Sequence, residues 1–104
     1  MIDLDKLDDA NKVLAELAKS DDDNIAAFSF NAMGDILLRQ EKKKEAVLKY
    51  MIPSLLFDAQ NKERPRALCQ SANILKELND NRSAKFSDML RKDYPDSPFI
   101  KELK

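Results

Sequence analysis

The chain has no histidine, one cysteine and one glycine in 104 residues, and each scarcity removes a class of site. Histidine is the commonest general base and the commonest neutral metal ligand, so its absence argues against most catalytic and metal centres. Cys69 alone can form neither an intrachain disulfide nor a cysteine-based metal site. One glycine, Gly34, cannot build a glycine-rich phosphate loop. We therefore predict a protein that is not an enzyme and that uses no cofactor and no metal.

Proline and glycine, the main turn-forming residues, are also few, and the net charge is small. Proline and glycine together number five, which argues against a turn-rich all-β fold. Hydrophobic residues make up 43% and charged residues 36%, a balance that can bury one core and keep the surface polar. The net charge of −1 gives no reason to expect a nucleic-acid partner or an anionic membrane. We predict one all-α domain, with neither a nucleic acid nor a membrane as its partner.

Targeting and membrane signals are missing as well. The chain starts with acidic, amphipathic residues rather than a signal peptide. Its longest apolar stretch runs from Tyr50 to Phe57, is interrupted by Pro53 and Ser54, and falls far short of the roughly 20 residues of a membrane span. A piece of a longer protein would carry no signal either. The compartment therefore stays open between the cytoplasm and a bacterial periplasm or envelope.

Apolar residues recur at helical spacing in five segments separated by short polar breaks. The sequence from Asp21 to Asn24 forms one break and offers an N-cap, and Pro65 suits the first turn of a helix. Pro53 should bend the helix that contains it. The helices are expected at about residues 3–19, 25–40, 43–56, 65–78 and 84–94, and a short helix capped by Ser97 is expected at about residues 98–103.

Gly34 lies within the second predicted helix, where glycine costs about 1 kcal/mol relative to alanine. A close approach between two helices would explain its presence there. We expect Gly34 to pack against the next helix, with Ala46 as the small residue on the other side of the contact. Apolar and aromatic neighbours would then close the helix pair.

The sequence pattern repeats along the chain. Gly34 has a counterpart in Ala72, and Leu37 has one in Leu75 at the same offset. The small residues predicted to open the second helix of each pair are Ala10, Ala46 and Ala84, which follow one another at nearly equal intervals. A simple four-helix bundle would show no such period, so we predict stacked helical hairpins.

The residues Phe30-x2-Met33-Gly34-x2-Leu37, followed by Ala46-x3-Tyr50, resemble the motif of the tetratricopeptide repeat. The ending Tyr94-Pro95-Asp96-Ser97-Pro98 is similar to that of a bacterial branch of the family. This resemblance implies an all-α, right-handed superhelix of antiparallel hairpins. It divides a single domain, residues 1–104, into a half repeat (3–20), two full repeats (25–61 and 65–94) and the start of a capping helix (95–104).

The resemblance also implies a concave groove lined by the first helix of each repeat, where a peptide or partner helix would bind without chemistry. Asparagine suits this role because its amide can hold a peptide backbone through both a donor and an acceptor. Capture of a C-terminal carboxylate is not expected, since Asp35 would repel it. The implied groove residues are Phe28, Asn31, Asp35, Leu38, Arg39, Arg66, Cys69, Asn73, Lys76 and Glu77.

Two alternatives to a peptide-binding scaffold remain open at this level. An array of two and a half repeats has an open end, so the chain could be a structural spacer or could associate with its own copies. Phe99, Ile100 and Leu103 could make such a contact or fold back as a cap. The chain could also be the docking or regulatory subunit of an enzyme, which would look the same in sequence.

Overall fold

A computed structural model describes residues 4–56 and 63–104, and these residues confirm the all-α prediction because none of them forms a strand. The polar break predicted from Asn61 to Arg64 lies partly outside the described residues, and its last two residues, Glu63 and Arg64, are helical. The last short helix is a 3-10 helix rather than an α-helix. The elements are α1 (Leu4–Leu17), α2 (Asp23–Arg39), α3 (Lys43–Leu56), α4 (Glu63–Glu77), α5 (Ser83–Asp93) and the 3-10 helix η1 (Pro98–Glu102).

Two predicted helix caps are confirmed. The Asp22 carboxylate accepts a hydrogen bond from the Asn24 backbone N–H at 2.9 Å, which satisfies a donor at the start of α2. The Ser97 hydroxyl accepts from the Phe99 N–H at 3.2 Å, and Pro98 occupies the first position of η1. Helix α4 begins at Glu63, two residues before Pro65, so the proline lies in its first turn.

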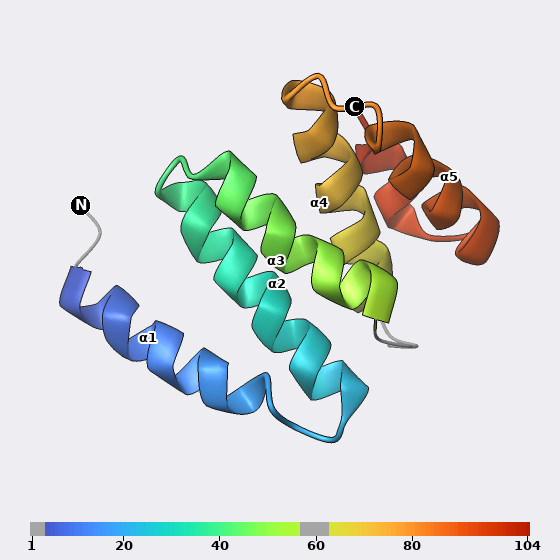
Figure 1. The fold of residues 1–104 in the computed structure, drawn as a ribbon. Helices are drawn as coiled ribbons and strands as arrows, with labels where there is room; N and C mark the ends of the chain where they lie inside the picture. Colours follow the sequence, from blue (N-terminus) through green and yellow to red (C-terminus); the bar gives the residue numbers. More distant parts are fainter. Residues whose placement is uncertain (1–3, 57–62) are drawn as a thin grey trace.

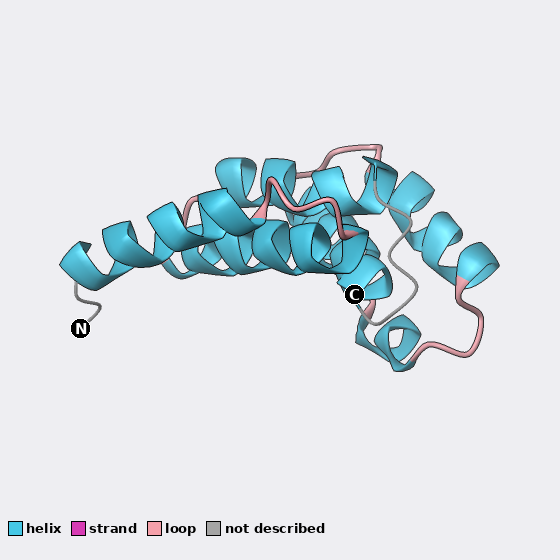
Figure 2. Ribbon diagram, turned by 90° about the horizontal axis from the view of Figure 1, so that it is seen from below, coloured by secondary structure: helices cyan, strands magenta, loops and turns pink. Residues whose placement is uncertain are grey.

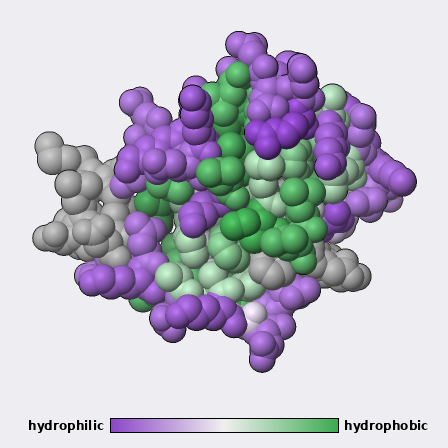
Figure 3. All heavy atoms as spheres, viewed as in Figure 1, coloured by the Kyte–Doolittle hydropathy of each residue, from purple (hydrophilic) through white to green (hydrophobic). Residues whose placement is uncertain are grey.

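Each helix packs on its neighbour in sequence (Figures 1 and 2). Helix α2 also contacts α4, and η1 contacts both α4 and α5. Helix α1 lies beside α2, at the edge of the molecule (Figure 1). On the face shown in Figure 3, apolar surface gathers where α3 lies, and this helix carries three exposed leucines: Leu48, Leu55 and Leu56.

The turns that end α2 and α4 have the same geometry. Glu41 and Asn79, which occupy equivalent positions in the two turns, both adopt left-handed backbone conformations, with φ of 62° and 57°. In the first turn the Lys42 N–H donates to the Leu37 carbonyl at 2.9 Å, and in the second the Asp80 N–H donates to the Leu75 carbonyl at 2.8 Å. The offset that relates Leu37 to Leu75 in the sequence is therefore also present in the backbone of these two turns.

Gly34 does make a close helix contact, but its partner is the Tyr50 ring rather than Ala46. A Cβ built on Gly34 would lie 2.7 Å from Cζ of Tyr50 and 2.8 Å from Cε1. Tyr50 is fully buried, and so is Ala46 one turn earlier on α3. Glycine at position 34 thus lets an aromatic ring lie directly on the backbone of α2.

The expectation that Ala84 repeats the role of Ala46 is wrong, because Ala84 is exposed. The buried residues of α5 are Phe86 and Leu90, which have the same spacing as Ala46 and Tyr50. The second hairpin is therefore closed by two large side chains rather than by one small and one large.

Arg64 joins the second hairpin to the first. Its Nε donates to the Ser54 carbonyl of α3 at 3.2 Å, and its Nη1 donates to Oδ2 of Asp93 at 3.1 Å and to the Tyr94 hydroxyl at 3.3 Å. Its guanidinium carbon lies 5.5 Å from the centre of the Tyr94 ring. A residue expected in a polar break therefore ties the start of α4 to the ends of α3 and α5.

We expect Gly34→Ala to destabilise the protein. Alanine would gain about 1 kcal/mol of helix propensity, but its Cβ would overlap a buried ring, and overpacking costs about 1–3 kcal/mol. Urea denaturation followed by circular dichroism measures the net effect. The same substitution in a Tyr50→Leu background should lose most of its penalty, because the ring is gone. A Gly34→Ala protein as stable as wild type would contradict this account.

Candidate functional site

A cleft opens between α2, the start of α4 and η1. Its volume is about 350 Å³, and its walls carry two phenylalanines, two acids and one arginine. Phe28 on α2 is 51% exposed although it is a large apolar side chain. We call this hollow the Phe28 cleft; its lining residues are Phe28, Ala32, Asp35, Glu63, Arg66 and Phe99.

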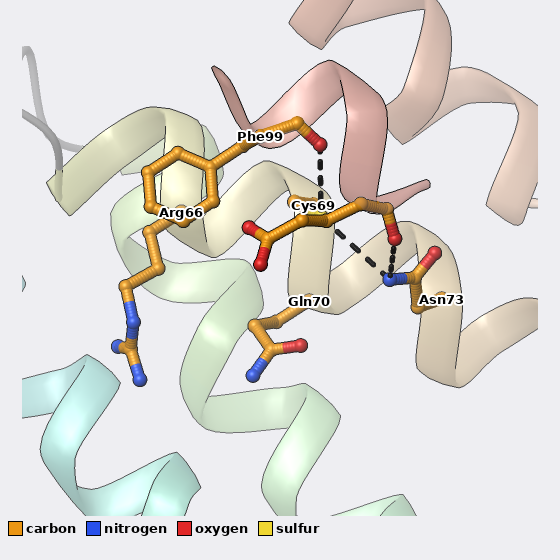
Figure 4. A pocket seen from close by; sticks show the side chains of 6 residues that line it. Arg66, Cys69, Gln70, Asn73 and Phe99 are labelled. Atoms are coloured by element: carbon orange, nitrogen blue, oxygen red, sulfur yellow. Dashed lines mark hydrogen bonds between the residues drawn. The ribbon is translucent and has the colours of Figure 1, made fainter. Parts of the chain in front are cut away.

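A second hollow of about 260 Å³ lies beside the first and shares Arg66 and Phe99 with it. We call it the Cys69 cleft. Figure 4 shows Arg66, Cys69, Gln70 and Asn73 projecting from α4, with Phe99 of η1 on the opposite side. Glu102 completes its lining. Polar groups therefore dominate this part of the site, whereas the Phe28 cleft is more aromatic.

The Asp35 carboxylate connects three helices at the floor of the site. It accepts a short hydrogen bond from the Tyr50 hydroxyl of α3. It also accepts from Nη2 of Arg66 on α4, at 2.6 Å for both of its oxygens. Burial, the largest single influence, lowers the pKa of Arg66, but the hydrogen bond donated to Asp35 and the electrostatic attraction of Asp35, Tyr50 and Glu63 together outweigh it, so the pKa is raised and Arg66 stays charged. The expected groove residues Asp35 and Arg66 thus meet, but they bind each other.

Asn31 was expected to line the groove, but its side chain is buried between α2 and α4. Its Nδ2 donates to the Glu63 backbone carbonyl at 2.9 Å and to Oε2 of Glu63 at 3.0 Å. Its Oδ1 has no hydrogen-bond partner among the described residues. Asn31 therefore holds the first turn of α4 against α2 and is not open to a ligand.

Asn73 holds the backbone of the C-terminal segment on both sides of its amide. Its Nδ2 donates to the Glu102 carbonyl at 3.0 Å, and its Oδ1 accepts from the Lys104 N–H at 2.8 Å. Lys76 adds a bond from Nζ to the Lys104 carbonyl at 2.7 Å, and Lys104 forms an ion pair with Glu77. The side chains expected to bind a peptide backbone on α4 thus bind the chain's own residues 102–104.

Cys69 is buried beneath the same segment. Its thiol donates to the Phe99 carbonyl at 3.4 Å, while its Sγ accepts from Nδ2 of Asn73 at 3.6 Å (Figure 4). Burial, assisted by the nearby Glu102 carboxylate, raises the pKa of the thiol, so the reactive thiolate is disfavoured. Cys69 therefore acts here as a packing residue with weak polar contacts.

The remaining expected groove residues lie away from the two clefts. Leu38 packs against the hydrophobic core, and Arg39 is exposed at the end of α2. Phe99, Ile100 and Leu103 fold back on the core, which was one of the two outcomes considered for them. Glu63 and Glu102 were not anticipated as lining residues. The sequence shows no sign of them, because only the packing of α4 and η1 brings their carboxylates to the clefts.

The described residues contain no group of three or more histidine, cysteine, aspartate or glutamate side chains that could hold a metal ion. None of the helices in this part of the chain is long and apolar enough to cross a membrane. Comparisons with protein-family models, curated proteins and solved structures gave no match.

Stability should depend on pH through Tyr50. Burial, followed by the hydrogen bond to Asp35, raises the pKa of its hydroxyl above the ordinary value. The unfolded phenol ionises near pH 10, so the stabilisation is complete below about pH 10 and is lost as the pH rises further. The stability advantage of wild type over Tyr50→Phe should therefore be constant near neutrality and shrink above about pH 10. Urea denaturation across pH tests this, with Tyr94→Phe as the control for loss of a phenol. A constant advantage throughout would contradict it.

Asn73→Ala should loosen the C-terminal segment without unfolding the helices. The substitution removes the side-chain amide that donates to the Glu102 carbonyl and accepts from the Lys104 N–H. Amide hydrogen exchange of residues 97–104 should become faster, while exchange in α2 and α3 stays unchanged. Asn73→Asp keeps an acceptor for the Lys104 N–H and should have a smaller effect. Unchanged exchange in Asn73→Ala would mean that apolar packing alone holds the segment.

Proposed function

We propose that this chain is a non-catalytic interaction module of the tetratricopeptide type, which binds a peptide or partner helix along the face formed by α2, α4 and η1. The side chains of the bound segment would enter the two clefts, beside the exposed Phe28 and the Gln70 side chain. The module would bind its partner on a preformed surface and would catalyse no reaction.

A repeated contact supports the stacked-repeat part of this proposal. The Asp35 carboxylate of α2 accepts from the Arg66 guanidinium of α4, and the Asn73 amide oxygen of α4 accepts from the Lys104 backbone N–H after η1. Each member of the second pair follows its counterpart in the first by the same offset, the one that also relates Gly34 to Ala72. The C-terminal segment contacts α4, and α4 contacts α2, which supports the proposal that like units stack.

The observation that carries the binding proposal is that side chains of α4 form hydrogen bonds with the chain's own backbone. Cys69, Asn73 and Lys76 make four hydrogen bonds to backbone groups of Phe99, Glu102 and Lys104. Side chains that recognise backbone atoms hold a segment largely irrespective of its sequence, which is what a peptide-binding surface requires. The Phe28 cleft shares Arg66 and Phe99 with this surface, and Phe28 in its lining is exposed.

Selection from a random peptide library tests the proposal. We expect selected peptides to shift the NMR signals of α2, α4 and η1. We also expect the double variant Phe28→Ala with Gln70→Ala to bind them at least about tenfold more weakly. Leu48→Ala, on the exposed surface of α3, serves as the control and should bind like wild type. Selected peptides that bind both variants equally would place the interaction elsewhere and would contradict the proposal.

Self-association remains a second candidate because apolar side chains are exposed at the N-terminal end of the array. On α1, Val13 is 59% and Leu17 39% exposed, and Ile25 at the start of α2 is 42% exposed. Light scattering on the same samples separates the two functions. A mass above one chain that falls when Val13 and Leu17 are replaced by serine would favour self-association.

A further inference from the structure

Residues 102–104 are held on α4 through their backbone. The Asn73 amide donates to the Glu102 carbonyl at 3.0 Å and accepts from the Lys104 N–H at 2.8 Å. Nζ of Lys76 donates to the Lys104 carbonyl at 2.7 Å. Every peptide carries backbone carbonyls, and nearly every residue carries an N–H, so these bonds do not depend on the sequence of the segment that makes them. Asn73 and Lys76 therefore form a subsite for peptide backbone, which the chain's own residues fill.

The conformation at this subsite suits an extended peptide rather than a helix. Leu103 lies between the two groups that bond Asn73, and its backbone is extended, with φ of −65° and ψ of 130°. Carbonyl and N–H groups inside an α-helix bond each other, so they are not available to a side-chain amide. A segment with the conformation of Leu103 has no such internal bonds and leaves both groups free.

Few other contacts hold residues 102–104 in place. The side chains of Glu102 and Lys104 are exposed. The ion pair between Lys104 and Glu77 joins side chains that are 60% and 31% exposed, and such pairs contribute little to stability. Leu103 is half-buried against the core and is the one apolar side chain among these three residues. A segment with so few buried contacts opens locally at a much lower free-energy cost than the helices beneath it.

Hollows flank residues 102–104 on both sides. Glu102 lines the Cys69 cleft, whose α4 wall is shown in Figure 4, and Leu103 and Lys104 line a further hollow of about 280 Å³ between α4 and α5. We call the latter the Lys76 hollow, because Lys76 is in its lining; it shares only Asn73 with the Cys69 cleft. Residues 102–104 thus lie across a depression that follows α4, and they leave space on either side. A longer peptide in their place would bury more surface than they do.

We infer that residues 102–104 compete with the partner for part of the binding surface, and that an extended peptide binds by taking their place on Asn73 and Lys76. Its backbone then passes from the Cys69 cleft into the Lys76 hollow, while Phe99 keeps its place in the wall of both clefts. This inference rests on the proposed function and adds to it a backbone subsite and a control of affinity. Only molecules in which residues 102–104 have left α4 offer the whole surface, so the apparent affinity is lowered by that fraction.

The experiment uses peptides selected from a random library on the wild-type chain. Leu103→Ala removes the apolar anchor of residues 102–104 and leaves α2, α4 and Phe99 unchanged, so it should bind these peptides at least about threefold more tightly than wild type. Lys101→Ala changes an exposed neighbouring side chain and should bind like wild type. Adding Asn73→Ala to Leu103→Ala should weaken binding relative to Leu103→Ala alone, because the peptide loses its backbone partner.

The Lys104 amide reports the displacement directly. Its N–H is bonded to Asn73 in the free protein, so saturating peptide should make its hydrogen exchange faster while the amides of α4 stay protected. Lys104→Pro removes this N–H and the exposed ion pair without altering the core, and it should also bind peptides more tightly than wild type. Circular dichroism checks that Leu103→Ala is folded; if it is not, Lys104→Pro decides by the same criterion.

The outcomes separate this inference from the function on which it rests. Peptides that bind at the clefts while Lys104 exchange is unchanged would overturn the inference and leave the interaction module intact. So would peptides that bind the folded Leu103→Ala variant no more tightly than wild type, because residues 102–104 would then be a fixed part of the surface. A library that yields no peptide binding along α2, α4 and η1 would overturn both.

Discussion

The contact between the Tyr50 ring and Gly34 sets the geometry on which the rest of the structure depends. A side chain at position 34 would push α2 and α3 apart, because its Cβ would lie within 2.9 Å of the ring. The same tyrosine donates its hydroxyl to Asp35, and Asp35 in turn orients Arg66 of α4. One aromatic residue thus determines both the spacing of the first hairpin and the position of the arginine between the two clefts.

Many of the polar residues on this face serve the stacking of helices first. Asn31 holds the start of α4, and Asn73 holds residues 102–104 in a corresponding way. The surface left for a partner is consequently narrower than the full set of first-helix side chains. It consists of the exposed Phe28, the shared Arg66 and the side chains that η1 adds from the other side. The proposed interaction depends on this combination, to which α2, α4 and η1 all contribute.

Local chemistry made much of the fold predictable. Asp22 and Ser97 cap their helices because their side chains can bond the free N–H groups of the first turn, and this requires only neighbouring residues. Glycine is unfavourable inside a helix, so Gly34 predicted a close contact with a neighbouring helix. The sequence was less informative about the residue across that contact, which is Tyr50 and not Ala46, and about Ala84, which is exposed. Those outcomes depend on how one helix is rotated against the next.

The sequence by itself determined that the fold is all-α and where the helices approximately end. It also determined the constant sequence offset that relates α2 to α4, the first helix of each hairpin. These features follow from periodicity, capping and turn chemistry, which act over a few residues. Only the tertiary structure decided that Asn31 is buried, that Asn73 binds residues 102–104, and that Glu63 and Glu102 line the two clefts. The reason is physical: a sequence pattern shows which face of a helix is apolar, whereas the partner of each polar side chain depends on the relative rotation and offset of helices that lie far apart in the chain.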